Sequence, residues 1–148
     1  MSAALDLPPR SSAAGVLERT LWGEAGHRPV RGIEGVAAVV MNRLRLARTP
    51  GGPQHLGGDV AGICRAPFQF ACWHPQNPRH AAMLAASLAE DPAFAICRRI
   101  AARALAGALP DAARGATHYH PADALPRWAI GQVPTAEIGG LVFYRLLG

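Results

Sequence analysis

The sequence predicts a single, mainly helical α+β domain with a small, irregular β element. Apolar residues recur at helical spacing in several segments of the 148-residue chain, whereas extended stretches are few and lie mostly toward the C-terminus. No apolar run approaches the ~20 residues that a membrane-spanning helix needs. A chain of this length is expected to bury one core. We therefore expect a disordered lead over residues 1–12 and one folded domain over residues 13–148.

Two helices are expected in the first third of the chain. Residues 13–24 can form the first, with Ser12 as a possible cap. The stretch 26–29 interrupts it, and Pro29 fits the first turn of the second helix. That helix has an apolar face that predicts core residues, while Asn42 and Arg43 fall largely elsewhere on the helical wheel. The residues of the apolar face are Ile33, Val36, Ala37, Val40, Met41 and Leu44.

Beyond the second helix the pattern predicts shorter elements. Phe68-Gln69-Phe70 alternates apolar, polar and apolar residues, which favours a short extended piece at the wall of a cleft. A helix over 91–106 is expected to start at Asp91 and Pro92, with its arginines facing outward and with Ile96, Ile100 and Ala104 as the inner stripe. The other expected elements are a loop over 49–59, a helical turn over 60–64, a helix over 78–89 and strands over 115–120 and 142–145.

One acidic residue stands out by its surroundings. Glu24 lies inside the segment Thr20-Leu21-Trp22-Gly23-Glu24-Ala25, beside an indole and at the expected end of a helix. Removal from water disfavours the charged form of a carboxyl group, so an acid in an apolar setting can hold a proton and donate it. The residues alone leave open whether Glu24 is such an acid or a surface residue near a helix end.

Several short motifs occur in the same chain in a characteristic order. They are Trp22-Gly23-Glu24-Ala25, the run from Gly32 to Arg43 that ends in Val40-Met41-Asn42-Arg43, Phe68-Gln69-Phe70 with Cys72-Trp73, and Thr117-His118-Tyr119. Together they resemble the bacterial cell-wall hydrolase family typified by the spore-cortex-lytic enzymes SleB and CwlJ. The resemblance extends from about Gly15 to Tyr144. The sequence departs from the family pattern after the glutamate, because Gly26-His27-Arg28 lacks an acidic residue that is common there.

The resemblance implies a lysozyme-like catalytic domain that cleaves the glycan strands of peptidoglycan, between N-acetylmuramic acid and N-acetylglucosamine. Characterised members of the family are similar to lytic transglycosylases. In these members the glutamate of the Gly-Glu-Ala motif is the catalytic acid, so the resemblance implies this role for Glu24. A hydrolase normally needs a second carboxylate, and none of Glu34, Asp59 and Asp123 stands out as that partner. A lytic transglycosylase needs only one acid, so the sequence favours this mechanism. No cofactor and no metal are expected.

Residues that could hold a sugar chain are found near these motifs. Aromatic rings can stack on sugar faces, and amide side chains can hydrogen-bond acetamido or hydroxyl groups. The resemblance ranks Gln69 and Tyr119 directly after Glu24, and Phe68 and Phe70 are equally well explained as core residues. The complete set of expected substrate-binding residues is Gln69, Tyr119, Asn42, Phe68, Phe70, Trp73, His118 and Trp128.

The net charge of the chain and its N-terminal segment indicate which partners and which location to expect. The fifteen basic residues are all arginine, and the net charge of +5 implies attraction to polyanions. These arginines are scattered and not interleaved with aromatics on one element, so we expect no nucleic-acid partner, and we expect a monomer acting on peptidoglycan at the cell wall. Met1–Arg10 shows no secretory signal, which leaves the export route open. Two explanations are compatible with this observation. The leader could be missing from this sequence, or the protein could leave the cytoplasm in the way a phage endolysin does.

Three alternative functions remain open from the residues. His118 and His120 are spaced to share a strand face, and Cys72, His74 or His80 could complete a zinc site of a wall amidase or peptidase. Cys72 with either histidine has the residue types of a cysteine peptidase. A non-catalytic protein that binds wall polymers would also fit the charge. The cysteines Cys64 and Cys97 are compatible with a disulfide in an oxidising compartment.

Overall fold

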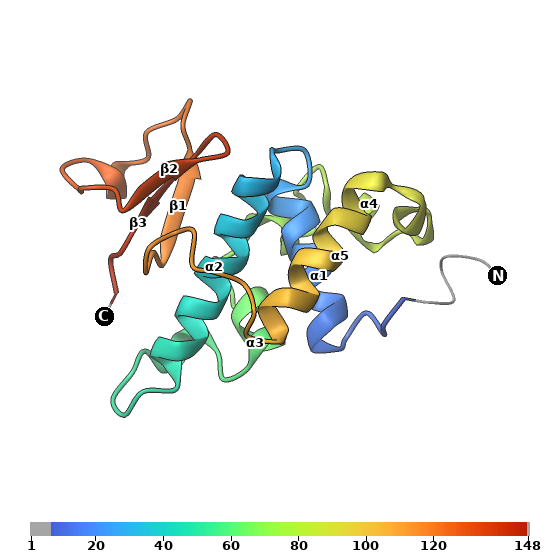
Figure 1. Cartoon of the computed structure of the whole chain (residues 1–148), viewed down its shortest axis with the longest axis horizontal. Coiled ribbons are helices and arrows are strands. Elements are labelled where there is room, and N and C mark those ends of the chain that lie inside the picture. The colour runs from blue at the N-terminus through green and yellow to red at the C-terminus, as the bar shows by residue number, and fades with distance from the viewer. Residues whose placement is uncertain (1–6, 148) are drawn as a thin grey trace.

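The computed structural model describes residues 7–147 and confirms the mainly helical α+β class. A body of helices is flanked on one side by a small antiparallel sheet (Figure 1). The helices are α1 (Ala13–Ala25), α2 (Val30–Ala47), α3 (Val60–Arg65), α4 (His80–Leu84) and α5 (Pro92–Leu105), with 3-10 turns η2 (Gln54–Leu56), η3 (Ala71–Trp73), η4 (Ala86–Glu90) and η5 (Arg127–Ala129). The strands are β1 (His118–Pro121), β2 (Ala136–Ile138) and β3 (Leu141–Tyr144).

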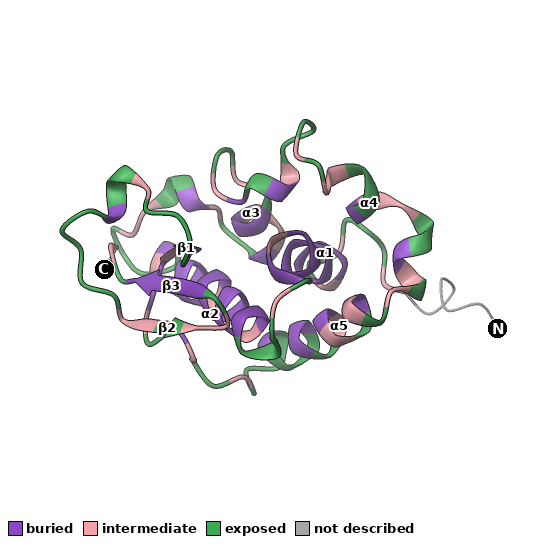
Figure 2. Ribbon diagram, turned by 90° about the horizontal axis from the view of Figure 1, so that it is seen from above, coloured by how far each residue is buried: buried purple, intermediate pink, exposed green. Residues whose placement is uncertain are grey.

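Helix α1 is the central element of the helical body. It runs through the middle with buried residues on all its sides (Figure 2). Between Gly15 and Gly26 every residue is buried except Glu24. The predicted first helix and its cap are confirmed, since the Ser12 hydroxyl accepts a hydrogen bond from the Gly15 amide at 3.0 Å.

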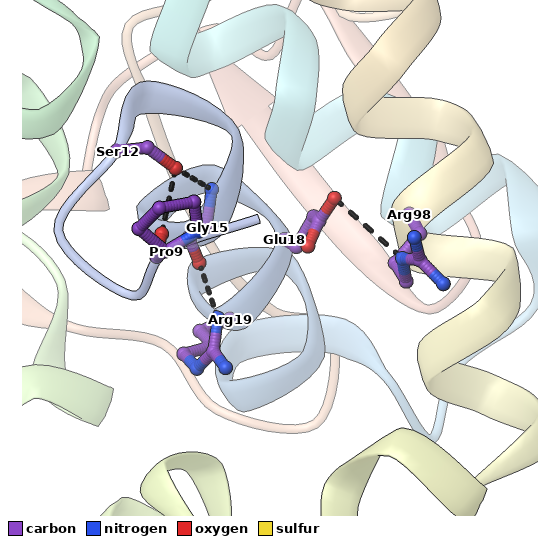
Figure 3. A network of polar contacts seen from close by, with 6 residues as sticks. All are labelled: Pro9, Ser12, Gly15, Glu18, Arg19 and Arg98. Carbon is purple, nitrogen blue, oxygen red and sulfur yellow. Dashed lines mark hydrogen bonds and ion pairs between the residues drawn. The ribbon is translucent and has the colours of Figure 1, made fainter. Parts of the chain in front are cut away.

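The chain is already folded before α1 begins. Ser12 donates to the Pro9 carbonyl through both its amide and its hydroxyl, which makes a turn that lies against Gly15 (Figure 3). Of the predicted disordered lead over 1–12, residues 1–6 lie outside the described residues. The folded unit therefore includes the turn at Pro9–Ser12 and does not start at residue 13.

Helix α5 packs along α1, and polar side chains join the two. Glu18, buried on α1, forms an ion pair with Arg98 Nε at 3.7 Å (Figure 3), and burial raises the pKa of the Glu18 carboxyl. The prediction that the arginines of this helix all face solvent is wrong for Arg98, which is only partly exposed. The inner stripe also differs from the prediction because it is centred on Cys97 and not on Ile96. The buried residues are Phe94, Cys97, Ile100, Ala101 and Ala104.

Helix α2 connects the helical body to the sheet. The predicted apolar face is confirmed, with Ile33, Val36 and Val40 fully buried or nearly so. Asn42 and Arg43 are buried too, contrary to the helical-wheel expectation, because the loop before β1 covers this side of α2. Their polar groups are satisfied there by the backbone carbonyls of Ala116 and Thr117.

The sheet has the strand order β1-β3-β2 and is antiparallel throughout. Tyr119 pairs with Phe143, and the Phe143 ring packs on Gly35 of α2, where a Cβ atom would come within 2.4 Å of the ring. The glycine therefore lets the sheet approach the helix closely. Strands β1 and β3 were predicted. Strand β2 was not, because the alternation of apolar and polar residues in Ala136-Glu137-Ile138 spans only three residues.

Three local predictions need correction. Residues 78–89 form no single helix: α4 ends at Leu84, and η4 follows after the extended residue Ala85. Phe68-Gln69-Phe70 is not an extended piece: Phe68 and Gln69 lie in a turn, with Phe68 at φ 63°, and only the backbone of Phe70 is extended. All three cysteines are buried free thiols, so Cys64 and Cys97 are not bridged. Within residues 7–147, none of the helices combines the length and apolar character that crossing a bilayer requires.

Candidate functional site

A cleft of about 660 Å³ lies where α1, α2, the turn at Phe68–Phe70 and the sheet meet. It collects side chains from distant parts of the sequence. Glu24 comes from the end of α1, Arg43 from α2, and Tyr119 from β1. Of the residues predicted for the site, those that line this cleft are Glu24, Phe68, Gln69, His118, Tyr119 and Trp128.

Both oxygens of the Glu24 carboxyl group are held by hydrogen-bond donors. The backbone amide of Cys72 donates to Oε2 at 3.0 Å, and the hydroxyl of Tyr119 donates to Oε1. A carboxylate with two such donors keeps a fixed orientation. Glu24 is half-buried and lines the cleft, while the other residues of α1 from Gly15 onward are buried.

The donor amide of Cys72 is positioned through Trp73. The Trp73 indole N–H donates to the Thr20 hydroxyl at 2.8 Å, which fastens η3 to α1 one turn before Glu24. Gly23 allows the close approach, since a Cβ atom there would come within 2.6 Å of the Cys72 Cβ. Trp73 itself lines a neighbouring hollow on the other side of the Phe68–Ala71 segment and not the Glu24 cleft.

Trp22 does not lie beside Glu24, contrary to the sequence interpretation. Residues two apart on a helix point to different faces, and the indole N–H of Trp22 donates to Asp91 at 3.0 Å. The Arg79 guanidinium lies 3.9 Å from the centre of the Trp22 ring. The groups that donate hydrogen bonds to the Glu24 carboxyl are the Tyr119 hydroxyl and the Cys72 backbone amide in η3.

Tyr119 is half-buried and lies between two aromatic rings. Phe70 lies 6.5 Å and Phe143 5.8 Å from it, measured between ring centres. Burial, followed by the nearby charge of Glu24, raises the pKa of the Tyr119 hydroxyl well above its ordinary value. The hydroxyl therefore keeps its proton and stays a hydrogen-bond donor to Glu24.

Arg43 is a cleft residue that the sequence interpretation missed. It is 4% exposed; Nε donates to the Thr117 carbonyl at 2.8 Å and Nη1 to Gln69 Oε1 at 3.0 Å. Its guanidinium lies 4.9 Å from the centre of the Phe70 ring. Burial lowers the pKa of Arg43, while Tyr119 and Glu24 act in the opposite direction. The only sequence signal was its place in the motif Met41-Asn42-Arg43.

His118 and His120 lie on the same face of β1, as predicted, and both rings contact Trp128. Desolvation, with a smaller effect of Arg43, lowers the pKa of His118 to about 4, so this imidazole is neutral near pH 7. The two ring nitrogens of His120 lie within hydrogen-bond distance of the Pro121 carbonyl and the Tyr144 hydroxyl. His118 and Trp128 thus form one wall of the cleft.

Two predicted substrate-binding residues lie behind the cleft wall. Asn42 is 3% exposed, and its amide nitrogen donates to the Ala116 carbonyl at 2.9 Å. Phe70 is also 3% exposed and supports Tyr119 and Arg43 from within the core. Phe68 is the opposite case: it is 99% exposed and stands at the rim between the cleft and the hollow that contains Trp73.

Glu24 is the one carboxylate among the described residues that line the cleft. Glu34 faces α5 and lies 3.7 Å from Arg103, and Asp59 caps α3 by accepting the Gly62 amide. Asp123 is exposed and does not line the cleft. None of the three acids considered as partners therefore lines the cleft with Glu24.

The described residues do not form the arrangement that the zinc-dependent or the cysteine-dependent alternative requires. The described part of the chain holds no group of three or more His, Cys, Asp or Glu side chains placed to share a metal ion. The Cys72 thiol is fully buried, and desolvation together with Glu24 raises its pKa. A cysteine nucleophile needs the opposite, an exposed thiol with a lowered pKa.

The fold of the chain is similar to that of known proteins. The chain is similar to two solved structures, the catalytic domain of the germination-specific lytic transglycosylase SleB from Bacillus anthracis and the catalytic domain of SleB from Bacillus cereus. The first is 21% identical with a TM-score of 0.65, covering 93% of this chain and 99% of that one. The second is 18% identical with a TM-score of 0.65, covering 97% of each.

At this level of identity the two structures establish the fold. No curated protein sequence matches the chain. The family model described as Cell Wall Hydrolase matches residues 27–144, a span that begins just after Glu24 and includes Arg43, Gln69 and Tyr119. Because this match covers most of the chain, the protein belongs to the cell wall hydrolase family.

Proposed function

We propose that this cell wall hydrolase cleaves the glycosidic bond between N-acetylmuramic acid and N-acetylglucosamine as a lytic transglycosylase, with Glu24 as both acid and base. One observation carries the proposal. Glu24 is the one carboxylate among the described cleft residues, and two donors hold it in place. A two-carboxylate hydrolase would need a second acid within about 10 Å across the cleft.

The reaction can be written with Glu24 alone. The protonated carboxyl group gives its proton to the glycosidic oxygen, and the electrons of the bond between that oxygen and the anomeric carbon leave with the oxygen. Positive charge then develops on the muramic acid ring. Its C6 hydroxyl attacks the anomeric carbon and passes its proton to the Glu24 carboxylate. The product is a 1,6-anhydro ring, no water is consumed, and the acid is regenerated.

The donors around Glu24 support both halves of this cycle. The Cys72 amide and the Tyr119 hydroxyl stabilise the carboxylate that exists between the two proton transfers. Tyr119 stays protonated, because burial raises the pKa of its hydroxyl, and so it does not compete with Glu24 for the proton. Phe68 and Trp128 are exposed at the cleft and can stack on sugar rings.

The test is mass spectrometry of the soluble fragments released from purified peptidoglycan sacculi. Wild-type protein, Glu24→Gln and Glu137→Gln are compared; Glu137 is exposed on β2 and does not line the cleft. Anhydromuropeptides from wild type and Glu137→Gln, but not from Glu24→Gln, are expected. Fragments with reducing ends would contradict the transglycosylase mechanism. Equal activity of Glu24→Gln would contradict the assigned acid, and no fragments from any of the three would contradict the proposed cleavage.

A further inference from the structure

Arg43 determines which end of the Gln69 amide faces a ligand. A guanidinium group has only hydrogen-bond donors, and Arg43 Nη1 lies 3.0 Å from Gln69 Oε1. The reversed amide would bring its NH₂ group against another donor, which is unfavourable. Oε1 is therefore held toward Arg43. No described residue accepts a hydrogen bond from Nε2, so this end of the amide is left for a ligand.

The Arg43 side chain is itself held on several sides. Its Nε donates to the Thr117 carbonyl at 2.8 Å, and the guanidinium lies 4.9 Å from the Phe70 ring centre. Because the residue before β1 and the turn at Phe68–Phe70 both contact this α2 side chain, Gln69 cannot rotate its amide without breaking a partly buried, charge-assisted hydrogen bond. Gln69 thus presents a pre-oriented N–H donor where the cleft meets the neighbouring hollow.

His118 offers a second oriented N–H donor in the cleft, and Thr117 sets its orientation. The Thr117 hydroxyl oxygen accepts from the backbone amides of Leu146 and Leu147, at 3.1 and 3.3 Å, so its hydrogen points to His118 Nδ1 at 2.9 Å. The imidazole is neutral near pH 7 because its pKa is lowered to about 4. Its proton is then on Nε2, and His118 also offers an N–H group.

We propose that Gln69 Nε2 selects N-acetylated glycan strands by donating to an acetamido carbonyl oxygen, with Arg43 as the positioning residue of this contact. The inference rests on the proposed function and adds to it a requirement on the substrate. A fixed donor needs an acceptor, and the acetamido carbonyl is the amide acceptor that recurs on peptidoglycan sugars. An N-deacetylated sugar carries an ammonium group, which only donates and which adds positive charge beside Arg43 and Arg28.

The experiment uses peptide-free glycan strands rich in N-deacetylated glucosamine, before and after chemical re-acetylation. Cleavage rates on the two preparations are measured for wild-type protein, Gln69→Glu and Gln132→Glu. The Gln69→Glu carboxylate keeps an acceptor for Arg43 but loses the N–H donor. Gln132 is exposed and does not line the cleft, so Gln132→Glu controls for the added charge.

Wild type and Gln132→Glu are expected to cleave re-acetylated strands about threefold to tenfold faster than deacetylated ones, as one hydrogen bond would give. In Gln69→Glu this ratio should fall to one or below, because a carboxylate attracts the ammonium group. Equal wild-type rates on both preparations, or an unchanged ratio in Gln69→Glu, would overturn the inference while the proposed function stands. No cleavage of either preparation by wild type would count against the proposed function itself.

Arg43→Lys tests the positioning role. A lysine has no planar fork and cannot donate to Thr117 and Gln69 with the same geometry, so the amide becomes free to turn. The rate ratio between the two preparations should then drop, mainly through a higher KM on re-acetylated strands. A ratio equal to that of wild type in folded Arg43→Lys would show that Gln69 does not depend on Arg43. If Arg43→Lys does not fold, Gln69→Glu still decides the inference.

Discussion

The hydroxyl of Tyr119 donates a hydrogen bond to Oε1 of Glu24 across a sequence separation of 95 residues. The contact joins the C-terminal turn of α1 to β1, so it also joins the helical body to the sheet (Figure 1). A shift of the sheet relative to α1 would therefore disturb Glu24 directly. Cleft geometry and catalysis are expected to respond together to changes on β1.

Removal of this hydroxyl should slow turnover without unfolding the protein. In Tyr119→Phe the ring contacts with Phe70 and Phe143 remain, but the carboxylate formed during the reaction loses one donor. A hydrogen bond to a charged group corresponds to about tenfold to a hundredfold in rate. The measurement is kcat on soluble glycan strands. Tyr144→Phe is the matched control, because the Tyr144 hydroxyl binds His120 and not Glu24; a comparable loss in both variants would contradict a specific role for Tyr119.

Gly23→Ala should destabilise the protein although alanine favours helix formation. An added Cβ atom would meet the Cys72 Cβ at 2.6 Å and both Cys72 Sγ and Met83 Sδ at 3.0 Å. Overpacking of this kind costs roughly 1–3 kcal/mol, more than the ~1 kcal/mol gained in helix propensity. Urea unfolding measures the net effect. Gly58→Ala has open space around its Cβ and should change stability little; a Gly23→Ala protein as stable as wild type would refute the close packing.

His118 should make stability fall with acid before the carboxylates are titrated. Its pKa is lowered to about 4 in the folded state, so the unfolded state binds more protons between that pH and about 6.5. Stability contributed by the neutral imidazole is present above pH 6.5 and is lost as pH falls toward 4. His118→Asn should reduce this loss in urea unfolding at pH 7 and pH 4.5. His55→Asn, an exposed histidine outside the cleft, should keep the wild-type difference.

Cys72→Ala should remain active. The contribution of this residue to the site is its backbone amide, whereas its thiol is buried and has a raised pKa. Activity on sacculi is expected within about threefold of wild type, since a small buried side chain is replaced by a slightly smaller one. Loss of activity in a folded Cys72→Ala protein would bring back the cysteine-peptidase alternative.

The elements with strong local signals were predicted correctly. The first helix follows from Ser12 and the apolar spacing after it, and α5 follows from Asp91 and Pro92 at its start, where the Asp91 carboxylate accepts the Ala93 amide at 2.8 Å. Strand β2 was not predicted because its alternating pattern spans only three residues, and the break at Ala85 was not predicted because no Gly or Pro marks it. These segments take their conformation from the elements on which they pack.

The sequence by itself determined the α+β class, the position of Glu24 at the end of a helix and the motif order that identifies the family. These features depend on residue type and on spacing along the chain. The tertiary structure alone decided which side chains meet Glu24: it turned Trp22 away, buried Asn42 and Phe70, and brought Arg43 to Gln69. Helical periodicity separates apolar from polar positions, but a buried arginine such as Arg43 is specified by the carbonyl and amide acceptors that other segments bring to it.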